Sequence, residues 1–161
     1  MATTRTKRLL LPIGIAIFLI AYFGPSSYRK AQMDKEVDRL CAVDGGIRIY
    51  EHISLPLRAF NQWGDPDIIE RPSPDGKSSY TLSNLSTEIV KGGTHGRGEP
   101  TLNRFHYQVI RLSDRKILGE SVSYGRFGGD PQGPFHPSSY SGCIEIWNDK
   151  ELLRKVFLKE K

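Results

Sequence analysis

Residues 9–24 read LLLPIGIAIFLIAYFG, an apolar stretch without a charged residue that closely follows Arg5, Lys7 and Arg8. At about 1.5 Å of rise per residue, a helix of these sixteen residues spans about 24 Å, short of the ~30 Å hydrocarbon core of a bilayer. Aromatic residues at its far end and basic residues at its near end can reach the two interfaces. We therefore predict a transmembrane signal anchor over 9–24, with residues 1–8 in the cytoplasm and the rest of the chain exported.

The same pattern of basic residues and an apolar stretch also fits a cleaved secretory signal peptide. Cleavage requires small residues one and three positions before the cut, and the nearest match, Gly24-Pro25-Ser26, contains a proline. Cys41 lies too far beyond the apolar stretch to serve as a lipoprotein cysteine. We expect an uncleaved anchor and keep the cleaved signal as the alternative.

The remaining chain has the size of one small domain, because about 135 residues can bury a single core. Three of the 23 Lys and Arg residues precede the apolar stretch, so 20 basic residues face all 18 acidic residues and the exported part carries a net charge of +2. Nucleic-acid-binding domains carry a clustered basic face, whereas acidic and basic residues alternate here. The charge pattern argues against a nucleic-acid partner.

The two cysteines, Cys41 and Cys143, both follow the predicted anchor. In an oxidising compartment, an even pair in a small exported domain favours a disulfide that joins the start of the domain to its end. Two free thiols, one of them reactive, are the alternative.

The chain after the anchor predicts an α+β domain. Pro25 and the serines after it should break or kink the first helix, and residues 25–42 should form a juxtamembrane helix leading into a domain over 43–161. Alternation predicts strands over 46–55 and 78–90, a hairpin of 105–112 and 117–124 around a turn at 113–116, and a last strand over 143–147. An apolar stripe predicts a C-terminal helix over 150–158, capped by Asn148 or Asp149. The expected fold is a small antiparallel β-sheet with a C-terminal helix.

Two loops contain many glycines. Residues 91–100 lack the spacing of a phosphate-binding loop and are interpreted as a flexible connection. Residues 125–142 combine glycine and proline with more aromatic side chains than a plain linker needs. We predict a binding surface there, because exposed aromatic and arginine side chains are typical of binding hot spots. Its candidate residues are Tyr124, Arg126, Phe127, Asp130, Phe135, His136 and Tyr140.

The sequence shows no catalytic constellation. Its four histidines, His52, His95, His106 and His136, have no spacing typical of a metal site, and no nucleophile–base pattern is recognisable. We expect no cofactor and no metal, and an enzyme is the less favoured interpretation.

The motifs CAVDGGIRIYE at 41–51, GESVSYGRFGGD at 119–130 and HPSS at 136–139 resemble those of small uncharacterised bacterial envelope proteins with one N-terminal hydrophobic segment. The resemblance covers most of the exported part. It implies a bacterial envelope setting and carries no activity.

These observations predict a single-pass bacterial inner-membrane protein. Its N-terminal helix lies in the bilayer, and its periplasmic domain is an interaction or accessory module with an envelope protein as partner. The alternative is a periplasmic ligand-binding or hydrolytic protein that acts on a cell-wall or small-molecule substrate, with Arg126, Asp130 and His136 lining the pocket.

Overall fold

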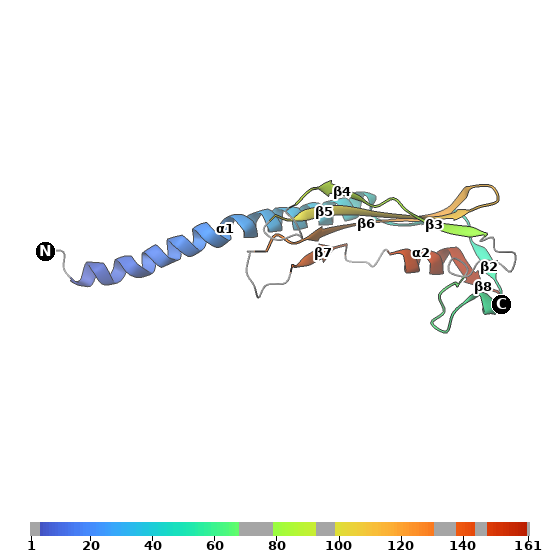
Figure 1. Cartoon of the computed structure of the whole chain (residues 1–161), viewed down its shortest axis with the longest axis horizontal. Helices are drawn as coiled ribbons and strands as arrows, with labels where there is room; N and C mark the ends of the chain where they lie inside the picture. Colours follow the sequence, from blue (N-terminus) through green and yellow to red (C-terminus); the bar gives the residue numbers. More distant parts are fainter. Residues whose placement is uncertain (1–3, 68–78, 93–98, 131–137, 144–147, 161) are drawn as a thin grey trace.

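The computed structural model describes residues 4–67, 79–92, 99–130, 138–143 and 148–160. Within the first helix, residues 4–11, 15, 16 and 19–23 are described by their backbone alone. The fold is α+β, with an antiparallel sheet and a C-terminal helix, as predicted. Figure 1 shows an elongated molecule in which the N-terminal part of the first helix projects beyond the sheet.

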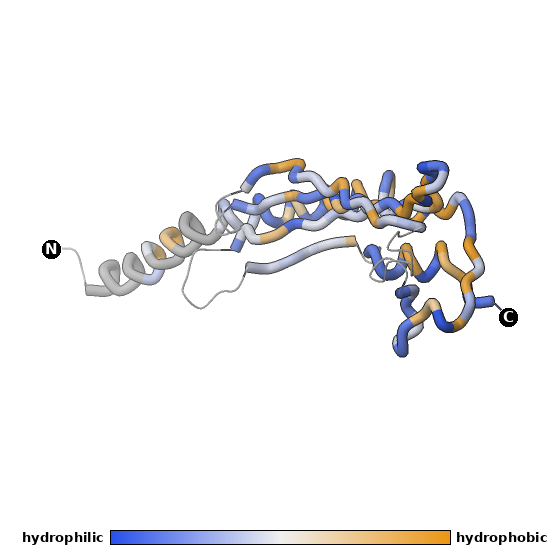
Figure 2. The backbone as a smooth tube through the Cα atoms, turned by 45° about the vertical axis from the view of Figure 1, so that its right-hand side comes forward, coloured by the Kyte–Doolittle hydropathy of each residue, from blue (hydrophilic) through white to orange (hydrophobic). Residues whose placement is uncertain are grey.

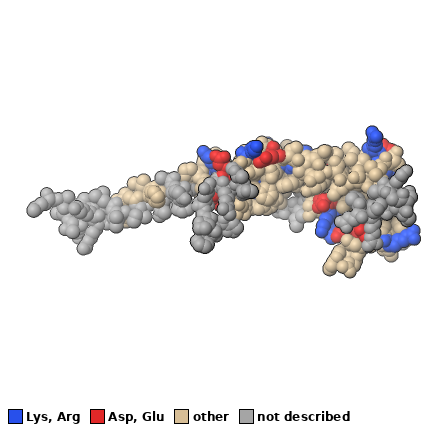
Figure 3. All heavy atoms as spheres, viewed as in Figure 1, with Lys and Arg blue, Asp and Glu red and all other residues tan. Residues whose placement is uncertain are grey.

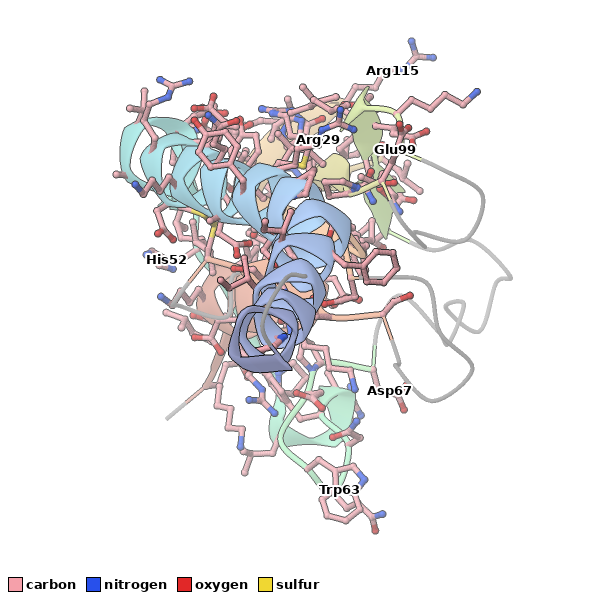
Figure 4. All side chains as sticks on the ribbon, turned by 90° about the vertical axis from the view of Figure 1, so that its left-hand side faces the viewer. Arg29, His52, Trp63, Asp67, Glu99 and Arg115 are labelled. Atoms are coloured by element: carbon pink, nitrogen blue, oxygen red, sulfur yellow. A yellow bond between two sulfur atoms is a disulfide. The ribbon has the colours of Figure 1, made fainter. Side chains whose placement is uncertain are left out.

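One continuous helix, α1 (Thr4–Asp44), contains both the apolar stretch 9–24 and the residues predicted to form a separate juxtamembrane helix. Pro12 and Pro25 both lie inside it, so of the two outcomes predicted at Pro25, a break or a kink, the break is wrong. A proline inside a helix removes one backbone hydrogen bond and bends the axis without necessarily ending the helix. Figure 4 shows α1 changing direction along its length.

The predicted membrane span is not confirmed. In the part of the chain that the structure describes, no helix combines the length and the apolar character needed to cross a bilayer. The side chains at 9–11, 15, 16 and 19–23, within the predicted span, lie outside the described residues.

A long hairpin forms the centre of the sheet. Strands β5 (Thr101–Arg111) and β6 (Lys116–Phe127) pair antiparallel along almost their whole length, and Arg115 in their turn has a positive φ of 56°. Alternating side chains and a polar turn predicted this hairpin, and the structure extends it at its open end, to Thr101 and Phe127.

Short strands line both edges of the hairpin. On the β6 side lie β1 (Gly46–Ile49) and β7 (Tyr140–Gly142), and on the β5 side lie β3 (Tyr80–Asn84) and β4 (Thr87–Val90), all antiparallel. The predicted strand over 78–90 is therefore interrupted, because Ser86 N–H turns back to the Asn84 Oδ1 atom over 2.9 Å. The predicted strand over 143–147 lies largely outside the described residues, and β7 ends just before it.

The predicted strand over 46–55 is also divided. The backbone N–H groups of Tyr50 and Glu51 both donate to the Leu118 carbonyl, at 2.8 and 3.0 Å, and this bulge turns the chain out of the sheet. The chain then forms β2 (Ile53–Leu55), which pairs in parallel with β8 (Phe157–Lys159) at the end of the chain. A short 3-10 helix, η1 (Leu57–Ala59), follows β2.

The C-terminal helix α2 (Asp149–Val156) is two residues shorter at its end than predicted, because the chain continues into β8. Its predicted cap is confirmed: the Asn148 side chain accepts a hydrogen bond from Glu151 N–H over 2.9 Å. Figure 2 shows hydrophobic segments gathered where α2, β2 and β8 meet.

The two helices cover opposite faces of the sheet at its two ends. The side chains of a strand alternate between the two faces of a sheet. In β6, the even-numbered residues from Glu120 to Arg126 are on the face that α1 covers. Gly119 is on the other face, where it lies against Val156 of α2. Two buried clusters result. The proximal cluster contains Val37, Cys41, Leu102, Val122 and Tyr124, and the distal cluster contains Val109, Leu118, Leu152, Val156 and Phe157.

The predicted disulfide is confirmed. Cys41 in α1 bonds to Cys143, which follows β7, with an S–S distance of 1.99 Å and a sequence separation of 102 residues. The bond attaches α1 to the edge of the sheet.

Candidate functional site

The predicted binding residues occupy different environments. Tyr124 and Arg126 are buried, with 4% and 1% of their surface exposed, whereas Phe127 and Tyr140 are 37% and 58% exposed. Asp130 is half-buried. Phe135 and His136 lie outside the described residues. The five candidate residues that the structure describes are therefore not gathered into one exposed patch.

Arg126 attaches the sheet to α1. Its Nε atom donates to the Asp34 carboxylate of α1 over 2.5 Å, and its Nη1 atom donates to the carbonyl of Gly128 and to the Ser139 hydroxyl, the latter over 3.2 Å. A buried guanidinium requires such partners, because desolvation of an unpaired charge is costly. The prediction that Arg126 is an exposed anchor for a partner does not fit this burial.

Asp130 makes a second attachment to α1. It accepts hydrogen bonds from Lys30 Nζ over 2.7 Å and from the Ser139 backbone N–H over 2.6 Å. Burial, the largest single effect, raises the pKa of this carboxyl, but the hydrogen bonds from Lys30 and Ser139 outweigh it and lower the pKa to about 2. Asp130 is consequently an ionised structural contact.

Tyr124 makes a third attachment. Its hydroxyl donates to the Asp44 carboxylate at the end of α1 over 2.7 Å, and Arg104 donates to the same hydroxyl over 3.2 Å. The hydrogen bond from Tyr124 is the main cause of the lowered pKa of Asp44, and burial is the main cause of the raised pKa of Tyr124. These three predicted residues thus position α1 on the sheet.

The two exposed aromatics lie on the face opposite α1. The Phe127 ring is 4.8 Å from the Tyr140 ring and 6.2 Å from the Phe105 ring, between centroids. Gly125 makes room for this group, since a Cβ atom there would lie 2.7 Å from the Tyr140 ring.

A polar cluster centred on Glu120 was not predicted. The Glu120 carboxylate accepts from the Tyr50 hydroxyl over 2.7 Å, from Arg48 over 3.3 Å and interacts with His106 Nε2 at 3.0 Å. The Tyr50 hydrogen bond is the main cause that lowers the pKa of Glu120 to about 2, with His106 and Arg48 acting in the same direction. Because β1 with the residue after it, β5 and β6 supply these side chains from distant parts of the sequence, spacing alone could not have identified the cluster.

Trp63 is another exposed aromatic residue, with 74% of its surface accessible. Figure 4 shows Trp63 pointing away from the rest of the molecule, so its ring does not anchor the loop around it. The loop is instead held by Asn61, whose side-chain oxygen accepts from the backbone N–H groups of Trp63 and Asp65, each over 2.9 Å.

A groove of about 360 Å³ lies between α1 and the β4–β5 side of the sheet. Its α1 wall follows helical spacing, i, i+3, i+4 and i+7, which is the one signal in the sequence that marks these residues as one face. The lining residues are Arg29, Gln32, Met33 and Glu36 from α1 and Val90, Lys91, Glu99, Pro100 and Leu102 from the sheet side. Arg29 and Glu99 form an exposed ion pair of 3.8 Å across the groove (Figure 4).

Among the residues that the structure describes, no group of three or more His, Cys, Asp or Glu side chains is arranged to hold a metal ion. No protein-family model, curated protein or solved structure matches the chain. Within the part of the chain that the structure describes, the groove between α1 and β4–β5 has the shape of a binding site.

Proposed function

We propose that the chain is a single-pass bacterial inner-membrane protein whose periplasmic domain is an interaction module in an envelope assembly. The observation that carries the proposal is the continuity of α1. One helix contains the apolar stretch 9–24 and also packs on the sheet, so the proposed anchor and the domain share one continuous helix.

The outer part of α1 favours an apolar surrounding. Ile13 and Ile17 belong to the apolar stretch, and 49% and 62% of their surfaces are exposed. In a bilayer these side chains would contact lipid, which removes the cost of exposing them to water. The basic residues before the stretch favour a cytoplasmic N-terminus.

The attachment of α1 to the domain supports a role in which orientation matters. The disulfide, the Arg126–Asp34 pair, the Lys30–Asp130 pair and the Tyr124–Asp44 hydrogen bond all join α1 to the sheet or its loops. Directional contacts of this kind restrict rotation of the domain about the helix. A domain held in this way presents the same surface to every partner in the plane of the membrane.

The anchor is tested with full-length protein in its native membranes. Introducing charges with Ile13→Lys and Ile17→Lys should release the chain from carbonate-washed membranes, because a lysine at the centre of a span costs about 2.5–3.5 kcal/mol. The matched control is Tyr28→Lys with Val43→Lys, at two exposed α1 positions beyond the apolar stretch. Equal membrane retention of both double variants would exclude the anchor.

The assembly is tested by native mass. The unmodified protein, extracted in mild detergent, should migrate as a discrete complex well above the 18.2 kDa chain with its micelle. A monomer migrating alone would contradict the stable-complex form of the proposal.

The alternative of a hydrolytic or ligand-binding protein has less support. It places Arg126, Asp130 and His136 around a pocket, but Arg126 and Asp130 are bonded to α1 and Ser139. His136 lies outside the described residues.

A further inference from the structure

Among the described residues, strand β4 forms an open edge of the sheet. Among the described strands it pairs with β5 alone, and all four of its residues are exposed. Ile89 and Val90 present 48% and 40% of their surfaces to solvent. An edge strand offers unpaired backbone N–H and C=O groups, which a further extended segment can bind.

The groove begins where β4 ends. Val90 closes the strand, and both Val90 and Lys91 line the groove, opposite Gln32 and Met33 of α1. An extended chain alternates its side chains at a period of two, so a segment along β4 can direct every second side chain to the α1 side of the sheet. The backbone edge and the groove thus form one continuous surface.

The charges around the groove favour some classes of binding partner over others. Two basic residues, Arg29 and Lys91, and two acidic residues, Glu36 and Glu99, surround an apolar lining that includes Met33, Val90, Pro100 and Leu102. Figure 3 shows basic and acidic side chains close together on the described surface rather than a patch of one sign. An anionic lipid or a nucleic acid gains little there, whereas a peptide with apolar side chains and charges of both signs is complementary.

We propose that the β4 edge and this groove bind an extended segment of a partner protein by strand addition, with apolar side chains of that segment entering the groove. The inference rests on the proposed function, because it names the surface and the partner chemistry of the interaction module.

A second copy of this chain fits the edge less well. Strand β4 runs along the long axis of the molecule, as α1 does (Figure 1). If two β4 strands paired antiparallel across a two-fold axis, that axis would lie perpendicular to the strands and the two α1 helices would point in opposite directions. Two such anchors could not enter the same membrane from the same side.

The test uses the full-length protein in its native cells, with the photo-reactive amino acid benzoylphenylalanine placed at Gln32 or at Ile89. Irradiation should cross-link both positions to the same protein, and the Ile89 adducts should map to one short segment of it. In the Gln32 background, Val90→Arg should lower the adduct yield by about fivefold or more, as expected for loss of a central apolar contact. Ile117→Arg is the matched control and should leave the yield unchanged, since Ile117 is a strand residue of similar exposure, 37%, outside the groove lining.

Three results would overturn the proposal: adducts with lipid only, adducts between two copies of this chain, or no adduct at either position. The native mass of the complex shows whether only this binding surface or also the proposed interaction module is wrong. A large complex without cross-links from Gln32 or Ile89 would overturn this surface and leave the interaction module standing, whereas a monomer would overturn both.

Discussion

The two ends of the sheet are attached to their helices by different kinds of interaction. The proximal cluster, under α1, is supplemented by a disulfide, two ion pairs and the Tyr124–Asp44 hydrogen bond. The distal cluster, under α2, consists of apolar side chains. Hydrophobic contacts are non-directional, whereas hydrogen bonds and ion pairs require a defined geometry. The difference indicates that directional contacts fix the orientation of α1 on the sheet, whereas burial of apolar side chains is the main contact between α2 and the sheet.

The largest expected loss of stability follows from breaking the disulfide between α1 and the sheet. Replacing both cysteines, Cys41→Ser with Cys143→Ser, should lower the free energy of unfolding by up to about 4.7 kcal/mol, because the bond closes a loop of about a hundred residues. Hydrogen exchange should accelerate more in the C-terminal half of α1 than in α2. Equal acceleration in both helices would show that the two ends are not distinct.

The next largest loss of stability is expected when a side chain of the distal cluster is shortened. Leu152→Ala removes a fully buried side chain and should lower the free energy of unfolding by about 2–5 kcal/mol, measured by denaturant titration. Leu158→Ala, at a position that is 42% exposed, is the control and should change it by less than about 0.5 kcal/mol. If Leu152→Ala and Leu158→Ala lowered the free energy of unfolding equally, burial in the distal cluster would not be what stabilises this end of the fold.

A smaller loss of stability is expected from replacing the buried Arg126, and it can be compared with the loss from replacing the more exposed Arg154. Arg126→Met should lower the free energy of unfolding by roughly 2–3 kcal/mol, because it deletes hydrogen bonds of a buried charged group. Arg154→Met removes a half-exposed pair with Asp65 and should cost less than about 1 kcal/mol. A larger loss for Arg154→Met in denaturant titrations would reverse our assignment of Arg126 as a structural contact.

The smallest effect concerns pH. The folded-state pKa of Glu120 is about 2, below its ordinary value of 4.5, so its stabilising contribution is complete above the ordinary value and disappears as the pH falls from 4.5 toward 2. Glu120→Gln should lower the free energy of unfolding at pH 7, because it removes the charge that accepts from Tyr50 and Arg48. The difference in unfolding free energy between the two proteins should shrink by pH 3, and a difference that stayed constant would contradict the assigned pKa.

Local signals in the sequence predicted the elements that depend on neighbouring residues. The β5–β6 hairpin follows from alternation around a polar turn, and the cap of α2 needs only Asn148 and the N–H group three residues later. The disulfide was predicted from cysteine number and compartment, without knowledge of geometry. The division of residues 46–55 was missed because it depends on the Leu118 carbonyl, which is remote in sequence.

The contacts of the candidate site residues were even harder to predict from local sequence. Arg126 and Asp130 have the composition of a binding loop, yet both bond to residues of α1 about a hundred positions earlier. The groove combines one face of α1 with the ends of β4 and β5. The helical spacing of the α1 wall is visible in the sequence, but no sequence pattern shows which distant residues α1 meets.

The sequence by itself determined the apolar stretch 9–24, the near-neutral charge of the rest of the chain, the central hairpin, the C-terminal helix and the pairing of Cys41 with Cys143. Each depends on local pattern or on composition. Only the tertiary structure decided that α1 continues through Pro25, which charged residues are buried, and that β4 remains an open edge beside a groove. The physical reason is that burial, ion pairing and edge exposure depend on which distant residues meet, and those contacts exist only once the chain has folded.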